Sequence, residues 1–260
     1  MGPALAASHA APALFVGSGD RGELILDRKV AIITGGSRGI GAGLVAAYRK
    51  RGWAVAAVAR MIKPSQDRSV LTLSADITEP GTADRIAAAA LERFGRIDTL
   101  VYNAGVFMSK PFTEYTPDDY AVVAGGSLTG FFWLTQRVIA EMATRYGGHV
   151  VNVLATPAEV ADSGVPSVLT ALTKGGLAAA TRSLAIEYAS LGIRVNAVSP
   201  GFIQTPVAAV GGYERLGDRL PPIGRVGQIS DVVNGVLFLE SSPYVTGEIL
   251  HIDGGQITGR

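Results

Sequence analysis

The chain has 260 residues, enough to bury the core of one large domain. Hydrophobic residues make up 48% of it and charged residues 17%, which argues against a disordered chain. The formal net charge of +1 gives no reason to expect nucleic acid or an anionic membrane as a partner. The lack of cysteine excludes disulfides and thiolate chemistry, and three scattered histidines (His9, His149, His251) argue against a histidine-based metal site.

Residues 1–27 are rich in Ala and Gly and show neither helix nor strand periodicity, so we expect a mobile arm there. We expect residues 28–260 to form one domain, because the patterns that follow continue without a break to the end of the chain. No apolar run is long enough to span a bilayer, and we therefore expect a cytoplasmic protein.

From Lys29 onward, short apolar runs rich in β-branched residues alternate with helical patterns. The first run, Val30 to Ile33, ends at a glycine turn, as a buried parallel strand should. Six similar runs follow: Ala54 to Ala59, Val70 to Ser74, Thr99 to Tyr102, His149 to Leu154, Arg194 to Val198 and Glu248 to Ile252. The alternation predicts an α/β fold, a single Rossmann-type doubly wound parallel sheet of about seven strands with helices on both faces.

Helical spacing is clearest over Gly41 to Arg51, Asp118 to Tyr146 and Leu169 to Leu191. One crossover is short, since only Met61 to Ser69, with Pro64 among them, separates the second and third predicted strands. A parallel crossover normally needs about a dozen residues or more, usually helical. We therefore expect a loop in place of a helix at this crossover.

A glycine-rich turn, Thr34 to Gly41, joins the first predicted strand to the first predicted helix. In such a turn Gly35 permits the tight bend, Gly39 lets the backbone approach a pyrophosphate, and Gly41 allows close packing of helix on strand. The N-terminus of the helix adds unpaired N–H groups and a positive dipole end. The turn predicts a dinucleotide site whose first contacts come from residues 35–41, which include Ser37, Arg38 and Ile40.

The spacing Thr-Gly-x-x-x-Gly-x-Gly resembles that of the short-chain dehydrogenase/reductase family. Further motifs of that family stand in order at Asp76, Asn103-Ala104-Gly105, Arg194 to Gly201 and Asp253-Gly254-Gly255, and the resemblance covers Arg28 to about Gln256. It implies contacts of Asp76 and its neighbour with the adenine and of the Asn-Ala-Gly motif beneath the cofactor. It also implies a segment that reaches toward the nicotinamide. The residues so implied are Asp76, Ile77, Asn103, Ala104, Gly105, Pro200, Gly201, Ile203 and Thr205.

The end of the second strand distinguishes NAD(H) from NADP(H). A protein specific for NAD usually has an acid there, which accepts hydrogen bonds from the ribose hydroxyls. Here Ala59 stands in place of the acid and Arg60 follows it. A guanidinium can bind a 2′-phosphate in bidentate fashion, and Arg38 is a second cation in the same region. NADP(H) is the predicted cofactor, with NAD(H) the less favoured alternative; both arginines could instead be solvated surface residues.

The catalytic motif of the family is only partly present. The resemblance implies a Tyr and a Lys four residues apart, a Ser upstream that polarises the carbonyl, and an Asn that supports a proton relay. Lys174 fits the lysine, but Thr170 stands four residues before it. Ala155 occupies the serine position and Ser127 the asparagine position. Three of the four groups are therefore expected to be altered.

An aliphatic hydroxyl is a far weaker acid than a phenol, so Thr170 does not replace a tyrosine as proton donor. A shift of the alignment by one residue would bring Thr156 to the serine position, whereas no tyrosine lies between Tyr146 and Tyr188. Tyr102 and Tyr213 are alternative donors, although each could equally be a packing or surface residue. Lys174 can bind the nicotinamide ribose whether or not a tyrosine is present.

Three functions remain open. The first is an NADP(H)-dependent oxidoreductase that acts on a small-molecule carbonyl, alcohol or activated alkene with a non-standard proton donor, such as water, a substrate group or Tyr213. The second is a sensor, scaffold or partner subunit that binds the cofactor without turnover, and the third a non-redox isomerase or cyclase. The intact glycine turn and the lack of an interaction tail favour the first. By analogy with the family, Ser230 to Ile252 predicts a homo-oligomer, a dimer or tetramer.

Overall fold

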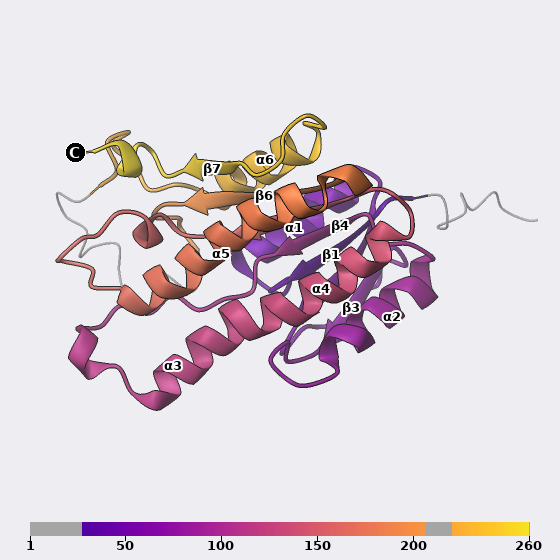
Figure 1. The fold of residues 1–260 in the computed structure, drawn as a ribbon, viewed down its shortest axis with the longest axis horizontal. Coiled ribbons are helices and arrows are strands. Elements are labelled where there is room, and N and C mark those ends of the chain that lie inside the picture. Colours follow the sequence, from indigo (N-terminus) through magenta and orange to yellow (C-terminus); the bar gives the residue numbers. More distant parts are fainter. Residues whose placement is uncertain (1–27, 206–219, 260) are drawn as a thin grey trace, which may run out of the picture.

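The computed structural model describes residues 28–205 and 220–259; the predicted arm, residues 1–27, lies outside them. Seven parallel strands form one sheet in the order β3-β2-β1-β4-β5-β6-β7 (Figure 1). The strands are β1 (Val30–Thr34), β2 (Ala54–Ala59), β3 (Val70–Ser74), β4 (Thr99–Tyr102), β5 (Gly148–Val153), β6 (Ile193–Pro200) and β7 (Ile249–Ile252). The predicted doubly wound sheet of seven strands is confirmed.

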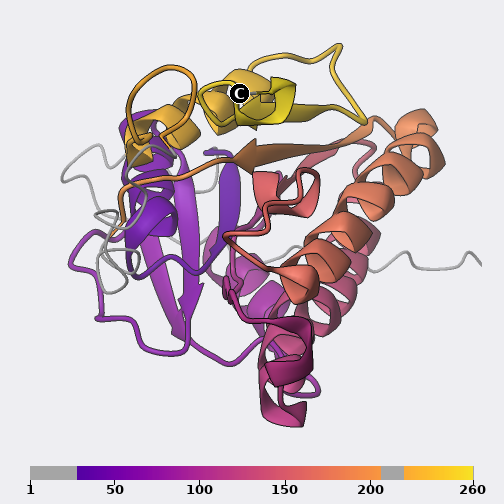
Figure 2. The same cartoon turned by 90° about the vertical axis from the view of Figure 1, so that its left-hand side faces the viewer.

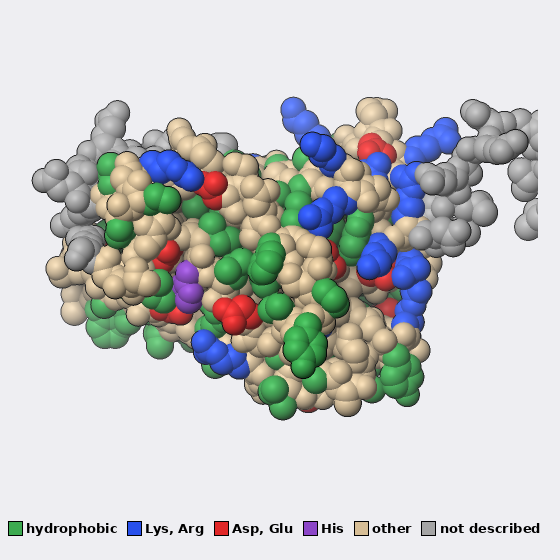
Figure 3. All heavy atoms as spheres, turned by 90° about the horizontal axis from the view of Figure 1, so that it is seen from above, with side chains coloured by type: hydrophobic (Ala, Val, Ile, Leu, Met, Phe, Trp, Pro, Cys, Tyr) green, Lys and Arg blue, Asp and Glu red, His purple; other side chains and the backbone are tan. Residues whose placement is uncertain are grey.

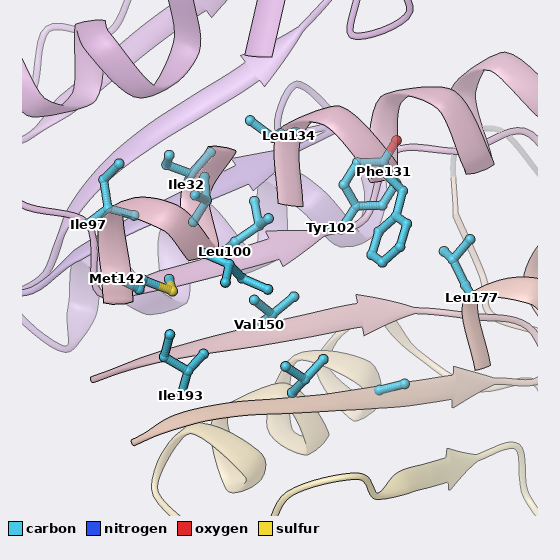
Figure 4. Close-up of a cluster of buried hydrophobic side chains, with 14 of the residues drawn as sticks. Ile32, Ile97, Leu100, Tyr102, Phe131, Leu134, Met142, Val150, Leu177 and Ile193 are labelled. Atoms are coloured by element: carbon cyan, nitrogen blue, oxygen red, sulfur yellow. The ribbon is translucent and has the colours of Figure 1, made fainter. Parts of the chain in front are cut away.

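The central strands are apolar along their whole length because both of their faces are covered. On one face, Ile32 lies beside Leu100, which lies beside Val150, and all three are buried (Figure 4). The next residue of β1, Ile33, is buried on the opposite face, in a second cluster with Val101 and its other neighbours. The sheet therefore separates two hydrophobic cores.

Helices form the outer layers. α1 (Gly39–Lys50) and α6 (Ile229–Glu240) pack on one face, and α2 (Thr82–Phe94), α4 (Gly130–Ala143) and α5 (Val168–Glu187) pack on the other (Figure 2). In Figure 1, α4 and α5 lie in front of the strands. No helix within residues 28–205 and 220–259 is long and apolar enough to cross a membrane.

Two connections differ from regular βαβ geometry. Residues 61–69, between β2 and β3, contain no helix, as the short crossover predicts. The helical pattern from Asp118 to Tyr146 corresponds to α3 (Pro117–Ala124) and α4, joined without a break by a π-helical segment, Gly125–Thr129. The pair Gly125-Gly126 lowers the helix propensity there, which favours an irregular turn at this point.

The glycine turn after β1 is held in one conformation by its own backbone and by β4. Gly35 (φ 68°) and Gly39 (φ 56°) are in the left-handed region. The Thr34 hydroxyl accepts the N–H groups of Asn103 (3.0 Å) and Ala104 (2.9 Å), and the Asn103 amide donates to the Thr34 carbonyl at 2.9 Å. A Cβ on Gly41 would lie 2.1 Å from the Gly35 carbonyl oxygen. Only glycine fits at position 41 while the turn keeps this shape.

We expect Gly41→Ala to lower the free energy of unfolding by about 1–3 kcal/mol, because its methyl group meets a backbone oxygen that cannot rotate away. Chemical denaturation of the two proteins measures the change. Gly175→Ala in α5 is the matched control, since a Cβ there has no neighbour within 4 Å. It should leave stability equal or raise it by up to about 1 kcal/mol. Equal stability of Gly41→Ala and wild type would contradict the close contact.

Candidate cofactor and proton-transfer site

The candidate site lies at the carboxyl ends of β1 and β4. From β1 the chain first builds the sheet outward through β2 and β3, then returns to the other side of β1 with β4. At such a reversal the connections leave in opposite directions, and a crevice opens between them. Thr34, at the end of β1, and Asn103, just after β4, meet there.

The start of α1 can hold an anion. Arg38 is the N-cap residue, with an extended backbone, and its side chain makes no capping hydrogen bond to α1. The first turn of α1 contains no acidic residue, so the positive end of the helix dipole is not neutralised locally. Ser37 and Arg38 are exposed beside it, and Ile40 is half-buried. The main-chain geometry of residues 35–41 therefore suits a phosphate group.

Arg60 and Asp76 lie together at the neighbouring strand ends. Asp76 accepts hydrogen bonds from the Thr78 N–H (2.9 Å) and the Thr78 hydroxyl (2.7 Å), and these bonds, with the nearby Arg60 guanidinium, lower the pKa of Asp76. The Gly36 N–H donates to the Val58 carbonyl at 3.0 Å, which joins the glycine turn to β2. Arg60, which is exposed, directly follows β2, the strand that pairs with β1 beside the glycine turn.

Two further segments border the same crevice. A Cβ on Gly105 would lie 3.1 Å from Lys174 Nζ, so the Asn103–Ala104–Gly105 stretch leads from the glycine turn to the lysine. The stretch from Pro200 to Thr205 leaves β6 toward α1, and Thr205 comes within 3.8 Å of a Cβ placed on Gly39. The predicted cofactor residues of these two segments therefore surround one region.

Along the second segment, backbone contacts fix the path. The Gly201 N–H donates to the Ile252 carbonyl of β7 at 3.1 Å, and Ile203 forms an isolated parallel bridge with Gly227. Ile77, which follows Asp76, is half-buried. Its side chain lies close to the start of α4, where a Cβ placed on Gly130 would be 2.8 Å from it.

Lys174 is the charged group of the site. Its side chain is 8% exposed, and Nζ donates to the Val153 carbonyl at 2.8 Å. Burial lowers the pKa of Lys174 to about 8. A Cβ placed on Gly105 would lie 3.1 Å from Lys174 Nζ and 3.6 Å from the Ser127 hydroxyl oxygen. Both polar atoms therefore border the same space beside Gly105.

The three remaining predicted catalytic positions do not form one group. The Thr170 hydroxyl, one turn before Lys174 on α5, is buried and has no hydrogen-bond partner among the described residues. Ala155 follows β5 and carries no donor. Thr156 faces away from the lysine, since its hydroxyl lies 3.4 Å from the Ser199 carbonyl and from an Asp253 carboxylate oxygen. The structure thus brings Lys174 and Ser127 to one space beside Gly105, whereas the Thr156 hydroxyl is directed to Ser199 and Asp253.

Of the two alternative tyrosines, Tyr102 does not take the position of a proton donor. Tyr102 is fully buried, packs edge-on against Phe131 with ring centroids 5.5 Å apart, and donates its hydroxyl hydrogen to the Gly126 carbonyl. Burial raises the pKa of Tyr102 well above its ordinary value. Tyr102 therefore holds the π-helical segment in place, and Tyr213 lies outside the described residues.

Three features of the site escaped the sequence reasoning. The π-helical segment puts Ser127 at the crevice, and its only signal was the pair of glycines in a helical pattern. The Val153 carbonyl that binds Lys174 is a backbone group, which no sequence pattern marks. A pocket of about 360 Å³ lies beyond the β5 end, lined among others by Thr156, Val160, Phe202, Pro221 and Gln256.

Comparison with known proteins agrees with this geometry. Residues 35–256 match the family described as enoyl-(acyl carrier protein) reductase. The chain is 31% identical over 240 residues to the 3-oxoacyl-(acyl-carrier-protein) reductase FabG of Vibrio cholerae, across 88% of this chain and 98% of that protein.

Solved structures give the same result. The 3-ketoacyl-(acyl-carrier-protein) reductase from Brucella melitensis, complexed with NADH, superimposes with a TM-score of 0.81 at 29% identity, across 89% of this chain and 99% of that one. ElxO with NADP bound gives a TM-score of 0.81 at 28% identity, with the same two coverages of 89% and 99%. The chain belongs to the short-chain dehydrogenase/reductase family.

Proposed function

We propose that this protein is an NADP(H)-dependent oxidoreductase that acts on a small-molecule carbonyl or alcohol, or on an activated alkene, with a non-standard proton donor. The observation that carries the proposal is the pairing of an uncapped α1 N-terminus and its glycine turn with the buried Lys174 in one crevice. When bound, NADPH supplies a hydride there. The related structures with NADP and with NADH support a nicotinamide dinucleotide at this place.

The cofactor choice rests on charge. The turn at residues 35–41 would hold the pyrophosphate, and Asp76 with Ile77 would border the adenine. Arg60, which follows β2 where no acid stands, and Arg38 would bind the 2′-phosphate of NADP(H). The Thr78 N–H and hydroxyl both donate to one carboxylate oxygen of Asp76, on which Arg60 acts through its charge.

The nicotinamide end would lie between Asn103–Gly105 and the stretch Pro200–Thr205. Lys174 would then bind the ribose through one of the two N–H groups that Val153 leaves free. The buried, unpartnered hydroxyls of Ser127 and Thr170 would donate to a polar group of the cofactor or the substrate, since a buried hydroxyl without a partner is destabilising.

One observation favours a second candidate function. Neither Thr170 nor Ala155 offers an acid comparable to a phenol or a polarising hydroxyl, so the family's usual proton transfer has lost two of its parts. A protein that binds NADP(H) as sensor, scaffold or partner subunit needs neither residue, and the same holds for an isomerase or cyclase that keeps the nucleotide as a structural element. Cofactor binding without turnover would distinguish this group of functions.

We further expect a homo-oligomer, a dimer or tetramer that includes the segment of α6 and β7. Val232, Val233 and Val236 cover the sheet, whereas Phe238 is 55% exposed and Tyr244 fully exposed. Figure 3, which views the molecule from above the view of Figure 1, shows hydrophobic side chains at the surface among polar ones. Exposed apolar side chains of this size support an association surface.

For assembly, light scattering on the purified chain should give two or four times the monomer mass. Phe238→Ser should shift the distribution toward smaller species, because it removes an exposed apolar contact. Ser241→Ala, an exposed position just past α6, is the control that should leave the mass unchanged. A monomer at all concentrations would refute the oligomer.

For cofactor choice, Arg60→Ala should weaken NADPH binding about tenfold or more, because it removes one charged hydrogen-bond donor from the 2′-phosphate. NADH affinity should change much less, since NADH lacks that phosphate. Isothermal titration of each nucleotide measures both effects. Arg145→Ala, exposed after α4, is the control for loss of a positive charge. An unchanged NADPH affinity of Arg60→Ala would refute the assignment.

For the reaction itself, NADPH oxidation should occur with at least one member of a panel of β-ketoacyl thioesters, activated ketones and enones. Tight NADPH binding with no turnover on any of them would overturn the oxidoreductase and leave the binding functions. The pair Thr170→Tyr with Ala155→Ser should then raise carbonyl reduction by about 10²-fold or more, because it returns a phenol beside Lys174 and a hydroxyl at the β5 end. Thr170→Phe with Ala155→Ser is the control, of equal size without the phenol.

A further inference from the structure

We propose that Lys174 is itself the proton donor and acceptor of the reaction, and that its amine performs the step for which the family motif would use a phenol. The inference rests on the proposed oxidoreductase function. It assigns to one side chain the proton that Thr170, Tyr102 and Ala155 cannot supply.

The position of Lys174 gives its ammonium a donor hydrogen that is not committed. Nζ has three N–H bonds, and the structure assigns one of them to the Val153 carbonyl at 2.8 Å. Gly105 lets the main chain after β4 come close to the amine, since a Cβ at that residue would lie 3.1 Å from Nζ. The Ser127 hydroxyl borders the same space. The lysine therefore faces the region bordered by both the cofactor and the proton-transfer residues.

The surroundings of Lys174 make its proton exchangeable near neutral pH. The groups beside it are the Val153 carbonyl from β5, Gly105 from the loop after β4 and the Ser127 hydroxyl from the π-helical segment, and Thr170 is buried one turn earlier on its own helix. Among the described residues, no charged or titratable group contributes to its pKa, and burial alone lowers that pKa to about 8. An ordinary lysine, with a pKa of about 10.4, would keep its proton.

The reaction balances with this group alone. In reduction, the carbonyl carbon gains a hydride from NADPH, and the carbonyl π-bond becomes an O–H bond as the oxygen takes a proton from the Lys174 ammonium. The products are the alcohol, NADP⁺ and a neutral amine, and the amine regains a proton from water. In oxidation, the neutral amine removes the alcohol proton. A group with a pKa near the working pH serves in both directions.

Burial also explains why the lysine can act without a tyrosine. A carboxylate in contact with Nζ would stabilise the charged form and raise its pKa. The described neighbours are instead uncharged, and the Ser127 and Thr170 hydroxyls can hold the substrate oxygen or a water while the proton moves. The two hydroxyls are positioning groups; neither is acidic enough to act as the donor.

The first test is direct titration of the amine, with no substrate needed. The Nζ resonance of Lys174 in ¹⁵N-lysine-labelled protein is assigned by its loss in Lys174→Arg and followed by NMR from pH 6 to 11. We expect a midpoint near pH 8, well below the value of about 10.4 for an ordinary lysine. A midpoint of 10 or above in wild type would overturn the inference, whatever the fate of the proposed function.

The second test separates proton transfer from cofactor binding. Lys174→Arg keeps a positive hydrogen-bond donor but cannot release a proton near neutral pH. We expect NADPH affinity within about tenfold of wild type, and a single-turnover hydride transfer to acetoacetyl-CoA, or to another active member of the panel, slower by about 10²-fold or more. Lys50→Arg, exposed at the end of α1, is the matched control and should keep the wild-type rate.

The pH profile completes the design. Reduction by wild type should fall above pH 8 and oxidation should rise through the same pH, because the first needs the ammonium and the second the amine. An active wild type whose rate and pH profile survive Lys174→Arg would overturn the inference and leave the oxidoreductase standing. If the wild type oxidised NADPH with no member of the panel, the proposed function would be refuted. The NMR titration would still show whether the Lys174 amine has its midpoint near pH 8.

Discussion

The close approach of α1 to the turn that precedes it governs the whole site. The Gly35 carbonyl oxygen occupies the place that a side chain of residue 41 would need. Only glycine at position 41 therefore allows α1 to start so close to the turn. Hydrogen bonds between Thr34 and the residues after β4, Asn103 and Ala104, hold the turn against the ends of β1 and β4. The same bonds fix the start of the segment that leads to Gly105, which lies beside Lys174. One steric constraint thus sets both the phosphate end and the catalytic end of the crevice.

Binding and chemistry depend on different parts of this arrangement. The groups that suit a phosphate are main-chain N–H groups at the start of α1, and they persist as long as the turn keeps its shape. The proton chemistry depends on single side chains of α5 and of the β5 end, which can change without effect on the sheet. Thr170 and Ala155 stand at such positions, and both are compatible with an unaltered fold. Retention of the cofactor site therefore says little about the reaction.

Much of this architecture follows from the sequence, because strand and helix periods are local properties. The seven strands, the loop at residues 61–69 and the glycine turn all lie where their patterns predict them. The direction of the Thr156 hydroxyl could not be predicted, since it depends on a contact with Asp253 almost a hundred residues later. The Lys174 bond to Val153 is likewise invisible, because the acceptor is a backbone oxygen and the burial of the amine arises only when α5 packs on the sheet.

The most direct measurement of the central claim is hydrogen–deuterium exchange of the full chain with and without saturating NADPH. The account predicts slower exchange of the amides of residues 37–42 when NADPH is present, because the phosphates would bind the N–H groups at the start of α1. The turn at Gly192, at the opposite end of the sheet, should exchange at the same rate in both samples. Unchanged exchange at residues 37–42 under saturating NADPH would contradict a cofactor held by this turn.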